Sequence, residues 1–182
     1  KKEEKIVGGK NGFGFKLVLI WSTFGSVETV DHKRGLKYTQ SFHDNLNTMD
    51  KPKVTKCKTK PYTRVTFRPD YARLGIPNLT PDMVNLFKRR IYDIASVTSK
   101  TVKVKCNSQL IPVKTVQQYV DLYLQSDAKK VYDAPNGRWE YAVAVSPTHE
   151  FIQVSFVNGI YPRNGGKHVD YIVGQVARKL IA

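Results

Sequence analysis

Glycines at positions 9, 12 and 14 stand directly before an apolar run, in the stretch GGKNGFGFKL of residues 8–17. Glycine in that number costs backbone entropy on folding, so the fold must need a bare backbone or positive φ angles there. Two structures meet this need: a tight turn, and a loop whose N–H groups surround a phosphate. The apolar run predicts a helix after the loop, and Lys16 in its first turn would place an ammonium group beside the same anion.

The spacing of these glycines, G-x-x-G-x-G, matches neither the dinucleotide-binding fingerprint nor the Walker A phosphate loop. A kinase-type glycine loop requires a preceding strand, and the sequence predicts none before residue 9. The loop alone therefore leaves both interpretations open, a structural turn and a phosphate cradle.

The chain carries 30 Lys and Arg residues against 15 Asp and Glu residues in 182 residues, a formal net charge of +15. Such an excess fits a polyanionic partner, nucleic acid first and nucleotide second, or serves solubility alone. Cys57 and Cys106 lack companions at metal-ligand spacing, so we expect no metal site and two thiols rather than a disulfide. No apolar run approaches the roughly 18 residues of a membrane span, so no membrane partner is expected.

The hydrophobic pattern predicts an α+β protein with antiparallel strands. A short helix within residues 15–24 is expected to be broken by Gly25. The next strands are expected to pair as 26–31 with 37–42 and 53–60 with 62–69. Alternating lysines in 51–60 are typical of the solvated face of an edge strand, and contact with DNA is the alternative.

The second part of the chain predicts three helices and two strand pairs. The clearest helix covers 79–97 and carries Met83, Phe87, Ile91 and Ile94 on one face, with Lys88, Arg89 and Arg90 off it as a solvated flank or a basic surface. Strands 101–106 and 109–113 precede a helix over 116–124, and strands 138–146 and 151–159 precede a helix over 169–181 with Val169, Ile172, Val176 and Leu180 on one side. We expect Tyr119 and Tyr123 to pack rather than to stack on bases.

The stretch VGGKNGFGFKL resembles the glycine-rich ATP-lid motif of the GHKL ATPases, in the form GGRNGYGAKL of the eukaryotic-type type IIA DNA topoisomerases. The resemblance continues through ETVD, YTRVTFRPD, FKRRIYDIA and RWEYAVAVS. It ends in QVSFVNGIYPRNGGKHVDYI, which is similar to the transducer-domain signature of the same family. The matches run from residue 6 to residue 182 in one order, so the chain is identified as a member of this family, cellular eukaryotic or from a large DNA virus.

The resemblance implies a fold and a domain organisation. Residues 1–112 would be the C-terminal part of a GHKL ATPase domain, with an antiparallel sheet, helices and the ATP lid. Residues 113–182 would be the first part of a transducer domain of the ribosomal-S5-like β-α-β type. Because the chain begins with Lys1 rather than Met and ends at Ala182 inside a helical pattern, we expect a fragment lacking both ends.

The resemblance also implies which residues contact the nucleotide. They are Lys10, Asn11, Gly12, Phe13, Gly14, Phe15 and Lys16 in the lid, and Thr63 at the adenine side of the pocket. Three of them depart from the family pattern: Phe13 replaces Tyr, Phe15 replaces Ala, and Lys10 replaces Arg, which loses the bidentate fork. The bulky Phe15 must point away from the nucleotide or reshape the lid. Thr63 has an equally plain interpretation as an ordinary strand threonine.

The transducer signature contributes Asn158, Gly165, Gly166 and His168, to which we assign a structural or relay role and no catalysis. In the family, the catalytic Glu, the Mg²⁺-binding Asn and the adenine-reading Asp all precede the lid. The lysine that reaches the γ-phosphate and the DNA-cleaving tyrosine follow later. We therefore expect no catalytic residue and no metal ligand in this segment, and negligible ATP hydrolysis by the segment alone.

The resemblance implies that the parent protein uses ATP and Mg²⁺, acts on double-stranded DNA as a homodimer, and passes one duplex through a break in another. It would be intracellular, in the nucleus for a cellular enzyme and in the host cytoplasm or nucleus for a viral one. Two alternatives stay open: a non-enzymatic basic module that binds nucleic acid, and another GHKL protein such as a mismatch-repair ATPase. The tract SFVNGIYPRNGGKH argues against the second, because that group carries a different sequence there.

Overall fold

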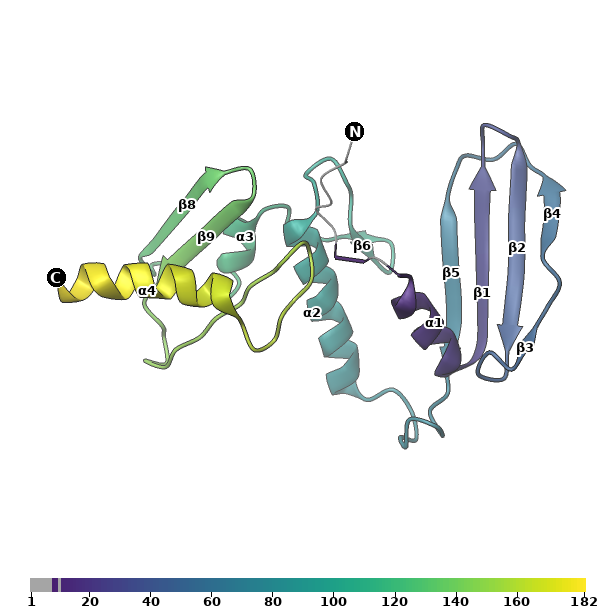
Figure 1. Cartoon of the computed structure of the whole chain (residues 1–182), viewed down its shortest axis with the longest axis horizontal. Coiled ribbons are helices and arrows are strands. Elements are labelled where there is room, and N and C mark those ends of the chain that lie inside the picture. The colour runs from purple at the N-terminus through teal and green to yellow at the C-terminus, as the bar shows by residue number, and fades with distance from the viewer. Residues whose placement is uncertain (1–7, 10) are drawn as a thin grey trace. The chain divides into compact units, whose positions relative to one another are not determined.

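The computed structural model describes residues 8, 9 and 11–182. Two compact units make up this part of the chain, one formed by Gly9–Thr80 and the other by Gly8 with Pro81–Ala182. Figure 1 shows the helices and strands of each unit along the chain. None of the described helices is both long and apolar enough to cross a membrane.

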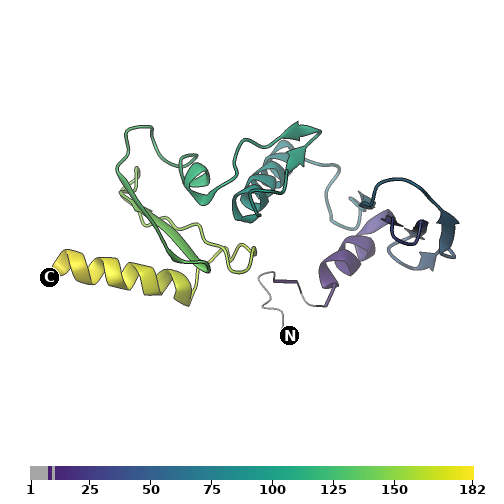
Figure 2. The ribbon, with the colours of Figure 1, turned by 90° about the horizontal axis from the view of Figure 1, so that it is seen from above.

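The first unit is an antiparallel sheet with one helix. Its elements are α1 (Phe13–Ile20), β1 (Ser22–Asp31), β2 (Leu36–His43), β3 (Thr48–Met49), β4 (Lys53–Lys56) and β5 (Thr63–Pro69). The strand order is β3-β2-β1-β5, with β4 also paired to β2. Figure 2, turned by 90°, shows α1 beside the strands of its unit. The predicted hairpin of the first two strands is confirmed, with Glu28 opposite Thr39 in its register.

Gly25 does not break a helix, so the predicted helix over 15–24 is wrong in its second half. Helix α1 ends at Ile20, and β1 runs straight through Gly25. A β-carbon added at residue 25 would lie 2.2 Å from Cδ2 of Leu19, whose side chain is buried. Glycine is therefore needed at this point because α1 approaches the sheet closely there.

The predicted pairing of 53–60 with 62–69 is also wrong. Strand β4 pairs with β2, while β5 pairs with the far side of β1. The connecting segment crosses the end of the sheet, where Cys57 donates its N–H to Gly35 and Val30 donates to Tyr62. Within the described residues β4 pairs with β2 alone, so Lys53 and Lys56 lie on an edge strand. The other lysines of 51–60 lie outside β4, and contact with DNA stays a prediction.

The two faces of this sheet differ in polarity. Phe67 lies opposite Gly25 and therefore shares the face that α1 covers. Val65 on the same face is 48% exposed and Phe67 is 49% exposed, so α1 covers only part of the apolar face. The opposite face carries Glu28, which forms ion pairs with Lys37 at 3.3 Å and Arg64 at 3.5 Å.

The second unit holds three helices and two short hairpins. Its elements are α2 (Pro81–Val97), β6 (Lys105–Cys106), β7 (Gln109–Leu110), α3 (Val116–Val120), β8 (Lys130–Asn136), β9 (Trp139–Ala144) and α4 (Lys167–Ile181). The core consists of Ala95, Ile111, Val113 and Tyr119. Residues from both sides of the predicted domain boundary at 112–113 thus share one core, and the boundary itself stays a prediction.

Strand β8 was missed by the sequence interpretation, and 151–159 form no strand. The partner of β9 is β8, and they meet through a turn at Asn136, Gly137 and Arg138. Asn136 pairs with Trp139, and its side-chain oxygen accepts hydrogen bonds from the N–H groups of Arg138 and Trp139, which closes the turn. The tract 151–159 takes part in a single bridge, between Val157 and Ile160.

The predicted apolar faces of two helices are only partly right. In α2, Phe87 is 52% exposed and Ile94 is 48% exposed, whereas Asp93, Ala95 and Ser96 are buried. The buried face is rotated to include Asp93, whose burial is possible because each of its carboxylate oxygens accepts a hydrogen bond inside the unit. In α4, the predicted face is half-buried at its first three positions and exposed at Leu180.

Candidate functional site

The glycine loop leads directly into the N-terminus of α1. Gly12 is the cap residue, with φ +68° and ψ 13°, a left-handed conformation that favours glycine. No side chain caps this helix by a hydrogen bond, and no acidic residue lies in its first turn. The N–H groups of the first turn therefore point outward with the positive end of the helix dipole, as an anion site requires.

Gly14 is placed differently from Gly12, because it lies inside α1 and has no positive φ. A β-carbon at residue 14 would meet nothing within 4 Å in the described structure. Neither backbone conformation nor internal packing therefore requires glycine there. In a helix, glycine costs roughly 0.5–1 kcal/mol relative to alanine, so the chain accepts a loss of stability at this position.

The charged and polar side chains of the loop are exposed. Lys16 lies in the first turn of α1, where its N–H group bonds the carbonyl of Gly12 at 3.5 Å. Its ammonium group forms no ion pair with the described residues. Asn11 is exposed beside it, and Lys10, also predicted to contact phosphate, lies outside the described residues.

The two phenylalanines of the loop have separate environments. The ring of Phe15 meets the ring of Phe42 edge-on, with centroids 6.3 Å apart. Phe15 thus points at the sheet and away from the exposed side of the loop, and its place relative to a bound nucleotide stays a prediction. Phe13 is 63% exposed and remains beside the open N-terminus of α1.

Thr63 lies at the start of β5, directly opposite Thr29. The two hydroxyl groups are 2.8 Å apart. Thr63 shares the sheet face on which α1 packs, but it lies four residues before Phe67, which is about 13 Å along the strand. The described contacts of Thr63 are thus with strand residues, and its adenine-side role stays a prediction.

The signature residues of the second unit form a connected turn before α4. Asn158 has φ +50°, Gly165 has φ +70°, and Gly166 caps α4. The ring of His168 contacts the hydroxyl of Ser155 through Nε2 at 2.9 Å. These contacts fix the turn before α4, in keeping with a structural role, and the relay role stays a prediction.

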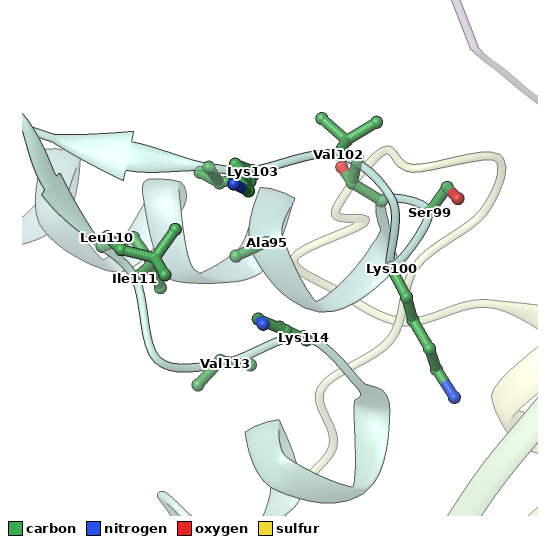
Figure 3. Close-up of a pocket in the computed structure, with 11 residues that line it drawn as sticks. Ala95, Ser99, Lys100, Val102, Lys103, Leu110, Ile111, Val113 and Lys114 are labelled. Carbon is green, nitrogen blue, oxygen red and sulfur yellow. The ribbon is translucent and has the colours of Figure 1, made fainter.

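A small cavity lies beneath the C-terminal end of α2, as Figure 3 shows. Apolar side chains from α2, β7 and the segments around them line it together with polar ones such as Lys103 and Lys114, while Lys100 extends away. Its volume is about 10 Å³, the space of a single water molecule. It is therefore a packing gap rather than a ligand site.

Among the described residues, no group of three or more His, Cys, Asp or Glu side chains lies close enough to hold a metal ion. The donors that surround the loop are N–H groups and an ammonium group, which suit an anion and repel a cation.

Comparison with known proteins gives the chain relatives over nearly its whole length. It is 42% identical over 188 residues to DNA topoisomerase 2 of Arabidopsis thaliana, covering 98% of this chain and 13% of that protein. It is 39% identical over 185 residues to DNA topoisomerase 2 of Acanthamoeba polyphaga mimivirus, covering 99% of this chain and 14% of that protein. The chain belongs to the type II DNA topoisomerase family. No family model matches the chain.

Solved structures place the chain in the ATPase region of type II topoisomerases. The ATPase region of Saccharomyces cerevisiae topoisomerase II matches with a TM-score of 0.89 and 39% identity, over 96% of this chain and 46% of that one. The ATPase and transducer domains of the Balamuthia mandrillaris enzyme match with a TM-score of 0.89 and 36% identity, over 97% and 45%. The predicted fold class is thereby confirmed.

Solved structures with lower sequence identity share the fold, and only the fold is inferred from them. The 43K ATPase domain of Thermus thermophilus gyrase B matches with a TM-score of 0.55 and 19% identity. The chain spans about half of the solved topoisomerase II ATPase regions and roughly one eighth of the full-length relatives.

Proposed function

We propose that residues 8–17 form a phosphate cradle in the ATP-binding region of a type II topoisomerase. The observation that carries this proposal is Gly14. Neither its backbone conformation nor its packing requires glycine, and yet it lies in the first turn of an uncapped helix. Without a side chain at residue 14, the N–H groups of this turn are open to close approach by a ligand. Close approach of a phosphate to the backbone is the physical reason for glycine at this position.

Each part of the cradle would make a different contact with the phosphate. The N–H groups after Gly12 and Gly14 donate to phosphate oxygens, and Lys16 adds a full positive charge beside them. These donors stabilise the charge that grows on the phosphate oxygens as the γ-phosphate passes to water. Asn11 would donate its side-chain amide to the same group.

Mg²⁺ is part of this proposal, although the described residues provide no ligand cluster for it. Its ligands would be the phosphate oxygens together with residues of the longer protein. The same holds for the general base that activates water, so the segment binds phosphate without completing the catalytic site.

The longer protein that contains this segment would act as an ATP-dependent DNA topoisomerase. ATP binding would order the lid and pair two copies, and the pair would pass one double-stranded DNA through a break in another. Support comes from the relatives, which are named DNA topoisomerase 2 in plant and virus alike. We propose an intracellular location, in the nucleus for a cellular eukaryotic enzyme and in the host cytoplasm or nucleus for a viral one.

ATP binding to the longer protein tests the cradle. Equilibrium binding of a labelled, non-hydrolysable ATP analogue is measured for the wild type, Lys16→Ala and the control Lys53→Ala. Lys53 is an exposed lysine of β4 in the same unit. The proposal expects at least a ten-fold weaker affinity for Lys16→Ala and less than about a two-fold change for the control. Equal loss in both variants, or none in either, would refute the cradle.

A further inference from the structure

A groove between α2 and the turn after α3 brings cationic and aromatic side chains together, and the proposed phosphate cradle makes no use of it. Its volume is about 350 Å³, at the lower end of the range for ligand pockets. The lining residues are Lys88, Arg89 and Tyr92 from α2, and Tyr119, Leu122 and Tyr123 from α3 and the turn that follows it.

The floor of the groove is a fixed polar network. Tyr119 is 4% exposed and donates its hydroxyl to Oδ1 of Asp93 at 2.5 Å, while Arg90 donates to Oδ2 at 2.6 Å. Since the one hydroxyl proton of Tyr119 goes to Asp93, the hydroxyl of Tyr123, 2.7 Å away, must donate to Tyr119. The rings of Tyr119 and Tyr123 are therefore held in place before any ligand arrives.

The wall of the groove offers apolar and aromatic surface. The ring of Tyr123 lies 5.3 Å from that of Tyr119 at an angle of 59°, and Tyr123 remains 41% exposed. Leu122 beside it is 56% exposed. Stacking of a nucleic-acid base on such a ring contributes about 1–3 kcal/mol and tolerates any base.

The rim of the groove is positively charged. Lys88 and Arg89 are exposed, and neither forms an ion pair with a described carboxylate. The nearest buried acid, Asp93, already has Arg90 as its partner. Arg89 is held in position by Tyr161, whose ring centre is 5.4 Å from the guanidinium. The rim thus attracts an anion while the wall favours a planar, apolar group.

We propose that this groove binds an unpaired nucleotide of single-stranded DNA, with its base against Tyr123 and Leu122 and its backbone at Lys88 and Arg89. Successive residues of a helix point about 100° apart, so the two cations address two different phosphates. A strand supplies two phosphates at the rim, whereas a free mononucleotide supplies one. The proposal concerns the second unit and stands or falls independently of the ATP cradle.

Fluorescence anisotropy of a labelled oligothymidylate of about ten nucleotides tests the proposal on the whole 182-residue chain. We expect Tyr123→Ala to weaken binding at least about five-fold and Tyr123→Phe, which keeps the ring, to change it by less than about two-fold. Arg89→Gln should lower the slope of log affinity against log salt by about 0.7. Lys105→Gln, an exposed lysine of β6 outside the groove, serves as the matched control.

Three results would overturn the proposal. Tyr123→Ala binding as tightly as the wild type excludes stacking. If unlabelled duplex DNA competes with the labelled oligomer as well as unlabelled single strand does, the groove is only a general basic surface. If thymidine monophosphate competes as well as the oligomer at the same concentration of nucleotides, the ligand is a free nucleotide rather than a strand. Circular dichroism checks the fold of each variant. If Tyr123→Ala fails to fold, the same binding measurement is made on Lys88→Gln, which changes an exposed side chain, and binding as tight as that of the wild type would overturn the proposal.

Discussion

The side chain of Leu19 occupies the place where a β-carbon of residue 25 would stand, with Cδ2 only 2.2 Å from that position. This contact seats α1 on the sheet and so fixes the direction in which the N–H groups of the glycine loop point. The position of the glycine loop thus depends on the packing of Leu19 against Gly25 of β1, a contact inside the unit.

Gly25→Ala should destabilise the chain by about 1–3 kcal/mol, because the buried Leu19 must move to admit a methyl group. Urea unfolding measures this cost. In a Leu19→Ala background the same change should cost much less, since the space is then open. Equal costs in the two backgrounds would show that the contact is absent in solution.

The variant Gly14→Ala distinguishes the two interpretations of the glycine loop, a structural turn and a phosphate cradle. Because Gly14 is helical and its β-carbon position is empty, alanine should leave stability unchanged or raise it by about 0.5–1 kcal/mol. ATP-analogue binding by the longer protein should fall at least ten-fold, since the methyl group would hinder close approach of a phosphate to the N–H donors. A variant that is more stable and binds as before would mean that the loop is only a turn.

Tyr119→Phe should destabilise the chain by about 1–3 kcal/mol, because it removes one donor from a carboxylate that is 1% exposed. Tyr123→Phe removes only the bond between the two hydroxyl groups and should cost less than about 1 kcal/mol. Thermal unfolding of both variants makes the comparison. The reverse order of costs would contradict the assignment of donors in this network.

Acid sensitivity should depend on Tyr62. The hydroxyl of Tyr62 donates to Glu28, and this bond, aided by Lys37, holds the pKa of Glu28 below its ordinary value of 4.5. A lowered carboxyl pKa stabilises the fold above the ordinary value, and this stabilisation is lost as pH falls through the lower, folded value. Tyr62→Phe should therefore lose stability at pH 7 and converge with the wild type in strong acid. A constant difference across the acid range would exclude this coupling.

The sequence predicted the family, the fold class and the first hairpin, because those rest on long motifs and clear alternation. It could not predict the partners of β4 and β5, since strand pairing depends on where the connection crosses the sheet. It placed the buried face of α2 wrongly because periodicity assigns apolar residues to the core, whereas here Asp93 is buried in a hydrogen-bond network between α2 and α3.

Within the site, the sequence indicated the glycine loop and Lys16, and the structure adds the direction of Phe15 toward Phe42. Of the groove beside α2, the sequence indicated only the cations Lys88 and Arg89, as a solvated flank or a basic surface. Its residues are far apart in the chain, and the tyrosines were expected only to pack, which Tyr119 does and the partly exposed Tyr123 does incompletely.

ATP hydrolysis by the longer protein, measured with and without plasmid DNA for the wild type and Lys16→Ala, is the most direct test of the phosphate cradle. We expect DNA to stimulate hydrolysis by the wild type and Lys16→Ala to abolish it, while the isolated segment turns over negligible ATP. If neither full-length protein hydrolyses ATP although both bind DNA, or if the segment alone shows robust Mg²⁺-dependent turnover, the account of this loop as the phosphate cradle of a topoisomerase is wrong.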